Sequence, residues 1–583
     1  MAIVRCFILL PVLIAASLLP AHANKQLDAI LEDHWVLVLS ENPTFATQLG
    51  VRTYDDRLGS LTVASMDDAT TARRGLVARL NDIADSELSE AERVNKRLLT
   101  TNLTQAIKSN SFGARLMPFS TYAGWHMGFP RLPENQPLRT LADYESYVAR
   151  LVDFARFNAE GIATTRTGVQ SGFILPCTIL DGFDKTITAH IVDEVEASVF
   201  WAPFQAKPDS IEDDAWKNLK ARGRAAIEEQ VIAGYQALAD FYTGEYLPNC
   251  AKEVGAGNLP DGAAYYAHRV AVETTTTLSP RQIHEIGLGE VKRIKDEMLA
   301  VMETTGFEGD FKAFQTFLRT DPQFYAKTPR ELMERTAWIS KRIDAELPKL
   351  FKRLPRIPYG VKPIPDAIAE KTTTAYYERP SGDGLRSGTY RVNTSKLNTR
   401  PLFEIEALTL HEAVPGHHLQ LALQQELDLP MFRRFSGITA FVEGWGLYAE
   451  RLGLEVGFYT DPYSNFGRLS YEMWRATRLV VDTGMHALGW SRERAVEFMA
   501  DNTLLSLHNI DAEVDRYISW PGQALGYKLG ELKIRELRTR AEKAFGDKFD
   551  IRTFHDEILK HGSLPLTLLE ANIDAWIDKE ASE

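Results

Sequence analysis

Apolar side chains recur every three or four positions along most of this chain, which is the spacing of one face of an amphipathic helix. The segment that begins with the serine and proline at 279–280 is an example, with apolar residues at 283, 286, 291, 294 and 298. A threonine-proline pair at 328–329 opens another such segment, and capping sequences at 89–92 and 140–143 mark two more helix starts. The pattern predicts a mainly α fold with little sheet, because no series of short alternating strands occurs.

One stretch, from Tyr376 to Thr394, departs from the helical pattern. Its two extended runs are separated by a turn-forming sequence rich in proline and glycine, which predicts strand, turn and strand. A polar, glycine-rich stretch from Glu253 to Gly262 separates long helical segments and is the best candidate for a boundary. We therefore expect an N-terminal helical lobe over 24–260 and a second lobe, with the small β element, over 261–583.

The N-terminus has the features of a signal peptide. Arg5 precedes an apolar run from Cys6 to Leu19, and Ala21, His22 and Ala23 form the small-x-small sequence after which signal peptidase cuts. Loss of residues 1–23 is expected, and no later stretch reaches about 18 apolar residues without a charge. These features predict a periplasmic or secreted protein that is not held in the membrane after processing.

Charge and length narrow the possibilities further. A net charge of -13 argues against binding to nucleic acid, whose phosphates require a basic surface. The mature chain of roughly 560 residues is long enough for two lobes or for one large composite helical domain. Two cysteines, Cys177 and Cys250, remain after processing, and they form either one disulfide or two buried thiols.

The candidate chemistry begins at His411 and Glu412, which are followed by Pro415 and then by His417 and His418. In the common zinc-binding helix two histidines stand four residues apart on one face, and the glutamate after the first is the catalytic base. A proline occupies that fourth position here, so the usual motif is absent. The two later histidines are the alternatives for the second ligand.

Helix geometry favours His417 over His418. On a regular helix His418 faces the same way as His411 but lies about 10.5 Å further along the axis, too far for both rings to reach one zinc ion comfortably. His417 points roughly 120° away on a regular helix. Pro415 lacks an amide hydrogen and Gly416 tolerates unusual dihedral angles, so the helix can bulge here and return His417 to the metal.

A further part of the site is predicted 26 residues after His417, where Glu443 and Glu450 stand seven residues apart. That spacing puts both carboxylates on one face of a helix. Glu443 on a neighbouring antiparallel helix would complete a site of three ligands and leave the open position that catalytic zinc requires. Glu450 would hold a ligating imidazole in its tautomer. The sequence thus predicts one Zn²⁺ per chain.

This layout resembles that of glutamate-zincin peptidases, in which a His-Glu helix is followed by a helix that carries two glutamates seven residues apart. Segments 411–420, 443–450 and 515–524 are also similar to a large bacterial family known as a domain of unknown function, and the resemblance covers nearly the whole mature chain. That family is similar to oligopeptidases and carboxypeptidases, which implies a mostly helical, two-lobed shell around a deep channel. The two extra residues within the His-Glu motif depart from the peptidase pattern.

The resemblance also assigns roles by position. It implies that the metal ligands are His411, His417 and Glu443, that Glu412 is the general base, and that Glu450 supports a ligand. Segment 526–530 is similar to the Gly-Tyr segment from which such peptidases direct a tyrosine at the oxyanion, which makes Tyr527 the candidate. Segment 388–394, with Tyr390, resembles the edge strand along which a peptide substrate lies.

The expected function is zinc-dependent hydrolysis of peptide bonds in short peptides, because an acidic protein with a buried, channel-like site would exclude folded substrates. Arg516, in the same segment as Tyr527, is the candidate to bind a free C-terminal carboxylate, which would make the enzyme a C-terminal exopeptidase. A simpler alternative for Arg516 is an ion pair with Glu513, about one helical turn earlier. Two other functions stay open: a peptide-binding protein that does not hydrolyse, and a hydrolase of a non-peptide amide or ester.

Overall fold

The computed structural model describes residues 24–369, 373–382, 384 and 386–582, and within them the protein is mainly helical with one three-stranded sheet. This confirms the predicted fold class and the small β element. The predicted signal peptide, residues 1–23, lies outside the described residues. Among the described helices, none is both long enough and apolar enough to span a bilayer.

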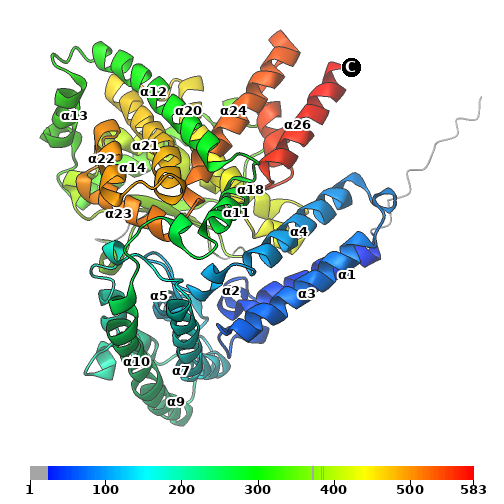
Figure 1. Cartoon of the computed structure of the whole chain (residues 1–583), viewed down its shortest axis with the longest axis vertical. Coiled ribbons are helices and arrows are strands. Elements are labelled where there is room, and N and C mark those ends of the chain that lie inside the picture. The colour runs from blue at the N-terminus through cyan, green and yellow to red at the C-terminus, as the bar shows by residue number, and fades with distance from the viewer. Residues whose placement is uncertain (1–23, 370–372, 383, 385, 583) are drawn as a thin grey trace, which may run out of the picture.

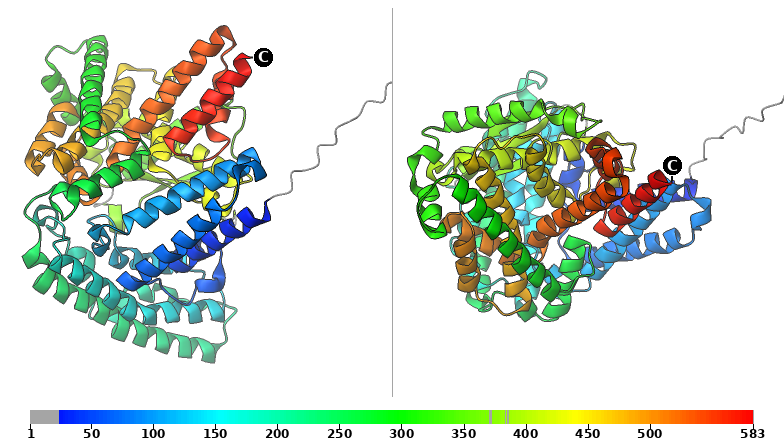
Figure 2. Two further views of the ribbon diagram at one scale, coloured as in Figure 1. Left: turned by 45° about the vertical axis from the view of Figure 1, so that its right-hand side comes forward. Right: turned by 90° about the horizontal axis from the view of Figure 1, so that it is seen from above.

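The first half of the chain forms two groups of packed helices (Figures 1 and 2). The first group, in blue, contains α1 (Lys25–Glu41), α3 (Val63–Asn81) and α4 (Glu90–Ser109). The second group, in teal, contains α7 (Leu141–Gln170), α9 (Asp213–Ala226) and α10 (Ala233–Phe241). The capping sequences at 89–92 and 140–143 begin α4 and α7 with reciprocal hydrogen bonds, as predicted.

The second half of the chain is built around four long helices: α12 (Pro280–Thr304), α20 (Thr439–Glu455), α21 (Pro462–Ala487) and α24 (Gly526–Phe545). α12 packs along α21, and α20 packs along α24. The second pair meets at Gly444 and Gly530, where a Cβ on Gly530 would stand 1.8 Å from the carbonyl oxygen of Ala440. Because only glycine fits there, Glu443 on α20 and Tyr527 on α24 extend from backbones that nearly touch.

The sheet has the order β1, β3, β2, formed by β1 (Tyr359–Pro363), β2 (Ala375–Glu378) and β3 (Gly388–Val392). β2 and β3 pair antiparallel, which confirms the predicted strand, turn and strand. The prediction that segment 388–394 is an edge strand is wrong, because β1 pairs in parallel with the other side of β3. Both sides of β3 are thus occupied and Tyr390 is 0% exposed, so neither this strand nor this side chain can bind a peptide.

One continuous hydrophobic core extends from Leu27 in α1 to Ile573 in α26 (Leu566–Ala581). At the predicted boundary, 253–262, the chain makes one short helical turn and then enters α11 (Gly262–Thr274). The helices before this point and those after it lie in different parts of the molecule (Figure 1). The division into two lobes and the deep channel stay predictions.

Cys177 and Cys250, whose state the sequence left open, form a disulfide that links positions 73 residues apart. Backbone hydrogen bonds lie directly beside it, since the amide of Cys177 donates to the carbonyl oxygen of Ala251 (2.8 Å) and the amide of Ala251 donates to that of Leu175 (3.0 Å). Closing a loop of this size stabilises the fold by about 4 kcal/mol in the chain-entropy model. The two stretches of chain at 175–177 and 250–251 are therefore firmly joined.

Candidate metal centre

The first helix of the site, α17 (Ile405–Glu412), is followed after a break of four residues by α18 (His417–Glu426). The backbone leaves the helical region at Ala413 (ψ -108°) and again at Gly416 (ψ -125°), and Pro415 between them has no amide hydrogen. A Cβ on Gly416 would lie 1.9 Å from a backbone carbonyl oxygen of α17, so the chain doubles back tightly. The predicted departure from a regular helix is confirmed.

This break brings His417 beside His411, with the ring centroids 4.6 Å apart and the rings nearly perpendicular, at 82°. Glu443 from α20 completes a group of three residues whose candidate ligand atoms all lie within 4.8 Å of one another. The Oε2 atom of Glu443 lies 3.6 Å from Nε2 of His411 and 3.4 Å from Nε2 of His417. The side chains of His411 and His417 are 3% and 10% exposed and that of Glu443 is 20% exposed, so Glu443 is the most exposed of the three.

His418, the alternative second ligand, points to the sheet instead. The hydroxyl of Tyr377 on β2 lies 2.8 Å from its Nδ1 atom, and the ring of Tyr359 on β1 is 4.8 Å away between centroids. Burial lowers the pKa of His418 to about 4, so the ring is neutral at physiological pH. Of the two histidines, only His417 joins His411 and Glu443.

Glu450 contacts the other side of His411, as predicted, with its Oε1 atom 2.8 Å from Nδ1 of the imidazole. Burial opposes a charge on His411, but bonds to Glu443 and Glu450 outweigh it and raise the pKa of His411 to about 9. Burial likewise opposes the charge of Glu443, and the two imidazoles outweigh it and hold the pKa of that carboxyl well below its usual value. Glu443 is therefore ionised. Because Nδ1 of His411 is bonded to Glu450, the other ring nitrogen of His411, Nε2, faces Glu443.

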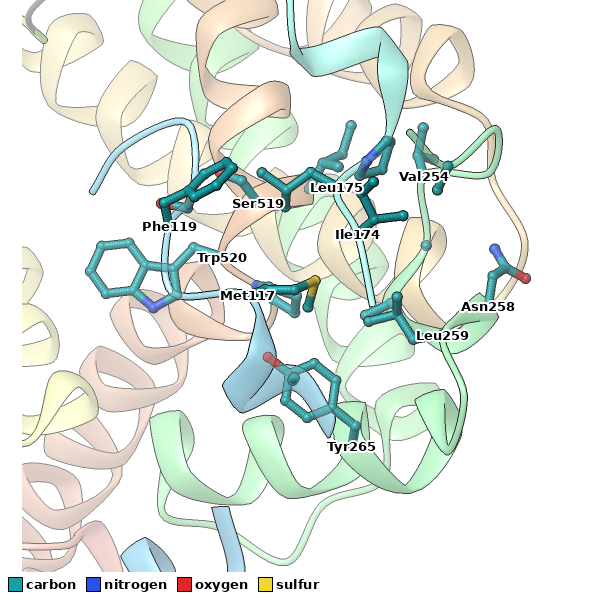
Figure 3. A pocket seen from close by; sticks show the side chains of 18 of the residues that line it. Met117, Phe119, Ile174, Leu175, Val254, Asn258, Leu259, Tyr265, Ser519 and Trp520 are labelled. Carbon is teal, nitrogen blue, oxygen red and sulfur yellow. The ribbon is translucent and has the colours of Figure 1, made fainter. Parts of the chain in front are cut away.

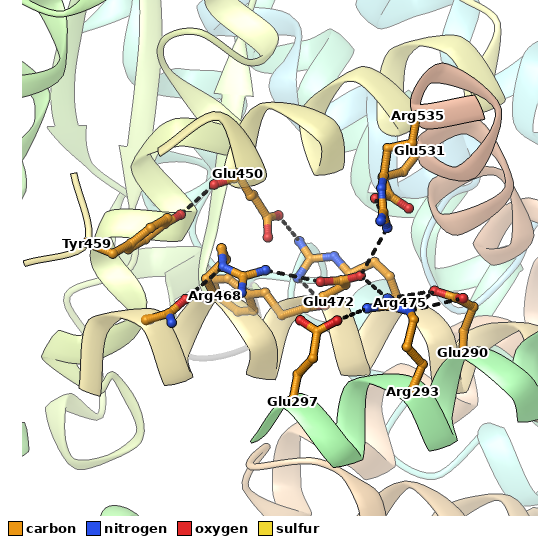
Figure 4. A network of polar contacts seen from close by, with 12 residues as sticks. Glu290, Arg293, Glu297, Glu450, Tyr459, Arg468, Glu472, Arg475, Glu531 and Arg535 are labelled. Atoms are coloured by element: carbon orange, nitrogen blue, oxygen red, sulfur yellow. Dashed lines mark hydrogen bonds and ion pairs between the residues drawn. The ribbon is translucent and has the colours of Figure 1, made fainter. Parts of the chain in front are cut away.

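Behind Glu450, buried ion pairs connect α20, α21, α12 and α24 (Figure 4). Arg475 lies 3.5 Å from Oε1 of Glu450 through its Nη2 atom. Glu472, also on α21, binds the ammonium of Lys528 at 2.8 Å, and Lys528 pairs with acidic side chains of α12 and α24 at 3.0 and 2.8 Å. Lys528 is fully buried and directly follows Tyr527. A buried Lys528 without its acidic partners would be strongly destabilising, so its side chain has to stay within this network. The network thereby fixes the start of α24 next to the site.

Glu412 and Tyr527 both neighbour His411. Glu412 directly follows it, is 9% exposed, and stands outside the group of three. The ring of Tyr527 lies nearly parallel to that of His411, at 17° and a centroid distance of 6.4 Å. Burial raises the pKa of Tyr527, and the carboxylate of Glu443 raises it further. Tyr527 therefore keeps its hydroxyl hydrogen at neutral pH and can donate a hydrogen bond.

Arg516 belongs to a second polar group beside Tyr527. It lies in α23 (Leu507–Ser519) and donates to Glu513 (3.0 Å) and Gln523 (2.8 Å), so the simpler alternative, an ion pair one turn earlier, is present. A second guanidinium, that of Arg478 on α21, binds the same Glu513 carboxylate at 3.2 Å. Arg478 also lies 4.3 Å from the centre of the Tyr527 ring. Two cations thus share one carboxylate.

Arg478 is a candidate site residue that no sequence motif singled out. Among the described residues, its Nη1 atom and the Nε atom of Arg516 are buried and have no hydrogen-bond partner. The available signal was the pair Arg475 and Arg478 within α21, a helix that is buried along most of its length. Charged side chains in such a helix are almost never fully buried unless they are paired, so their presence indicates a partner or a ligand.

Comparison with known proteins places the chain in a family. The family model described as "Bacterial protein of unknown function (DUF885)" matches residues 43–573. The "putative lipoprotein" from Colwellia psychrerythraea is 28% identical, with a TM-score of 0.88 over 95% of this chain and 99% of that chain. The "putative lipoprotein of unknown function" from Shewanella oneidensis is 18% identical, with a TM-score of 0.68 over 94% of this chain and 98% of that chain, and shows likeness of fold alone. No curated protein matches. Since the family model spans most of the sequence, the chain belongs to the DUF885 family of bacterial proteins.

Proposed function

We propose that this protein is a zinc-dependent hydrolase of peptide bonds in short peptides. The observation that carries the proposal is the group formed by His411, His417 and Glu443, with Glu412 beside it. Two imidazoles and one carboxylate form a known ligand set of catalytic zinc, in which the fourth position stays open. A glutamate that is close to such a group but is not one of its ligands is suited to act as the base.

The distances within the group fit a zinc ion. Ligand atoms about 2.0–2.2 Å from zinc in a tetrahedral arrangement lie roughly 3.3–3.6 Å from one another. The Oε2 atom of Glu443 lies 3.6 and 3.4 Å from the Nε2 atoms of His411 and His417. Nδ1 of His411 is bonded to Glu450, so Nε2 is the nitrogen available to a metal. For His417, by contrast, the Nδ1 atom is buried and has no hydrogen-bond partner among the described residues, so no neighbour selects the tautomer of this ring.

When bound, the zinc ion would polarise the substrate carbonyl and lower the pKa of water. Glu412 accepts a proton from the attacking water and later delivers it to the leaving amine. Tyr527 donates a hydrogen bond to the carbonyl oxygen, on which negative charge develops. Glu450 keeps His411 in the tautomer that presents Nε2 to the site.

The proposed direction of cleavage, from the C-terminal end, rests on the charge beside Tyr527. Arg478 and Arg516 together carry two positive charges, and Glu513 neutralises one of them. The remaining charge is buried, and one guanidinium nitrogen of each arginine has no hydrogen-bond partner among the described residues. A free peptide carboxylate has the charge and the two acceptor oxygens that such a pair binds best.

Tyr527→Phe is expected to lower kcat about a hundredfold and to change KM little, because the hydroxyl acts on charge that develops only in the transition state. The measurement is steady-state kinetics on a short peptide. Tyr463→Phe, a tyrosine of α21 outside the site, is the control and should retain full turnover. Near-normal turnover in the Tyr527 variant would show that another residue stabilises the oxyanion.

Amidation of the peptide C-terminus is expected to lower kcat/KM at least tenfold, because the amide cannot neutralise the charge at Arg478 and Arg516. Arg516→Ala should remove most of this difference between free and amidated peptides, and Arg516→Lys, which keeps the charge but not the planar fork, should keep part of it. Cleaved ends are mapped by mass spectrometry, and N-terminal acetylation is tested in parallel.

The matched control is Arg492→Ala in α22 (Arg492–Asn502), which removes a cation that pairs with Asp515 in the helix of Arg516. This variant should still distinguish the two peptide forms. If acetylated peptides are the ones that resist cleavage, the direction is reversed and the enzyme acts from the N-terminal end. If zinc is bound but no peptide of a mixed library is cut, the two alternatives remain: hydrolysis of a non-peptide amide or ester, and binding of peptides without hydrolysis.

The proposed compartment is the periplasm or the exterior of the cell. A disulfide such as Cys177–Cys250 persists in oxidising compartments. Both solved neighbours are described as lipoproteins in the words quoted above, which is consistent with export. The pattern over residues 1–23 supports the same route.

A further inference from the structure

A cavity of about 370 Å³ lies outside the candidate metal centre (Figure 3). Four stretches of chain line it: 114–124, 172–176, 251–259 with Tyr265 of α11, and 518–521 at the end of α23. Neither the three candidate ligands nor Glu412 is among the described residues that line it. The volume is at the small end of the range of about 300–1,000 Å³ that is typical of ligand pockets, so it suits one or two side chains of a peptide.

The walls of this cavity are mainly apolar. Figure 3 shows the side chains of Met117, Phe119, Ile174, Leu175 and Trp520 around it. No lysine or arginine is found among the described lining residues, and Glu253 is the one charged residue, at an exposed position. A charged group placed inside would lose its hydration without a counter-ion, so the cavity favours an uncharged apolar group.

The walls are also held in place before any ligand arrives. The Cys177–Cys250 disulfide joins two of the lining stretches. Stretch 251–259 is also held by His486 on α21, whose Nδ1 atom accepts a hydrogen bond from the amide of Ala256 (2.8 Å). The Nε2 atom of the same ring lies 3.0 Å from the carbonyl oxygen of Tyr517 in α23. A preformed pocket binds with a smaller loss of conformational entropy.

Arg516 does not line the cavity, but it contacts two residues that lie in or beside the lining. Trp520, 39% exposed, stands four residues after Arg516, and its amide donates to the carbonyl oxygen of Arg516 at 2.9 Å. Tyr122 lies between the lining residues Ser120 and Ala123 in the sequence, and its ring centre is 6.0 Å from the Arg516 guanidinium. A hydrogen bond between the hydroxyls of Thr121 and Ser519 (2.8 Å) joins stretch 114–124 to stretch 518–521.

We propose that this cavity binds an aromatic or large aliphatic side chain of the C-terminal residue of a peptide whose carboxylate is held at Arg516. The proposal rests on the proposed function, because it takes the carboxylate position from it. It adds a side-chain preference that the charge at Arg478 and Arg516 cannot provide. Peptides that end in phenylalanine or leucine are then the preferred ligands, and those that end in glycine or aspartate are poor ones.

Binding is measured by calorimetry on the full mature chain that carries Glu412→Gln, so that no peptide is consumed. Ala-Ala-Phe is expected to bind at least tenfold more tightly than Ala-Ala-Gly, as burial of one aromatic side chain implies. Ala123→Phe, at an exposed lining position, should fill the cavity and bring this ratio close to one, with little change for Ala-Ala-Gly. Trp520→Ala should lower the ratio by removing a wall.

The matched control is Ala163→Phe, which adds the same ring at an exposed position of α7 away from the cavity and should leave the ratio unchanged. Equal binding of the two peptides, or a preference that Ala123→Phe and Trp520→Ala both leave intact, would overturn the cavity assignment. Cleavage of peptides by the wild-type protein is scored separately. A preference in binding without any cleavage would support the cavity and contradict the proposed function, and cleavage without a preference would do the reverse.

Discussion

Glu412→Gln is expected to keep its zinc and to lose turnover by a factor of about 100 to 10,000, because the amide has nearly the shape of the carboxylate but cannot accept the proton of the attacking water. Glu412 lies at the end of α17, directly after His411. It is not part of the group of His411, His417 and Glu443. The metal-binding atoms are therefore unchanged in the variant.

Two measurements on the same preparation test this expectation: zinc per chain by elemental analysis, and kcat on a short peptide. Glu426→Gln is the control, because it makes the same replacement at the far end of α18, where Glu426 pairs with the exposed Arg356. It should keep both zinc and activity. Loss of zinc from the Glu412 variant would make Glu412 a ligand, and retained turnover would assign the base to another residue.

Much of the fold could be predicted because its signals are local. The capping sequences at 89–92 and 140–143 act within one helical turn, and the helices begin where they indicate. The strand, turn and strand between Tyr376 and Thr394 also pair with near neighbours in the sequence. The partner of β3 on its other side, β1, comes from 359–363 and forms a parallel pair through a long connection. Nothing within 388–394 indicates that second partner, which is why the edge-strand prediction failed.

The candidate site also combines features that a local sequence pattern predicts with features that it does not. His411, His417, Glu443 and Glu450 come from two short segments whose spacing fixes which side chains share a face, so their approach could be predicted. Pro415 and Gly416 indicated where the helix breaks. Arg478 reaches Tyr527 only because α21 and α24 pack together, and the apolar cavity combines four distant stretches of chain. Such features depend on tertiary packing, and no local spacing encodes them.

His417→Ala is expected to lower zinc affinity by more than a hundredfold, whereas His418→Ala should leave it nearly unchanged. His417 presents Nε2 to Glu443 at 3.4 Å, but His418 is bonded to Tyr377 and packs on Tyr359. Removal of His418 leaves the half-buried Tyr377 hydroxyl without this partner, which costs roughly 1 kcal/mol of unfolding free energy. The two variants therefore separate loss of metal from loss of stability.

Glu450→Gln is included as a variant with an intermediate expected loss of zinc affinity. Its carboxylate supports His411 through the 2.8 Å bond to Nδ1 without touching the metal position, and loss of such support lowers affinity about 10–100-fold. Competition with a chelator gives the three affinities, and thermal unfolding gives the stabilities. The expected order of zinc affinity is His418→Ala, then Glu450→Gln, then His417→Ala. If the His418 variant were instead the one that lost zinc, the break at Pro415 would close in the metal-bound protein, and the second ligand would be the histidine that now faces the sheet.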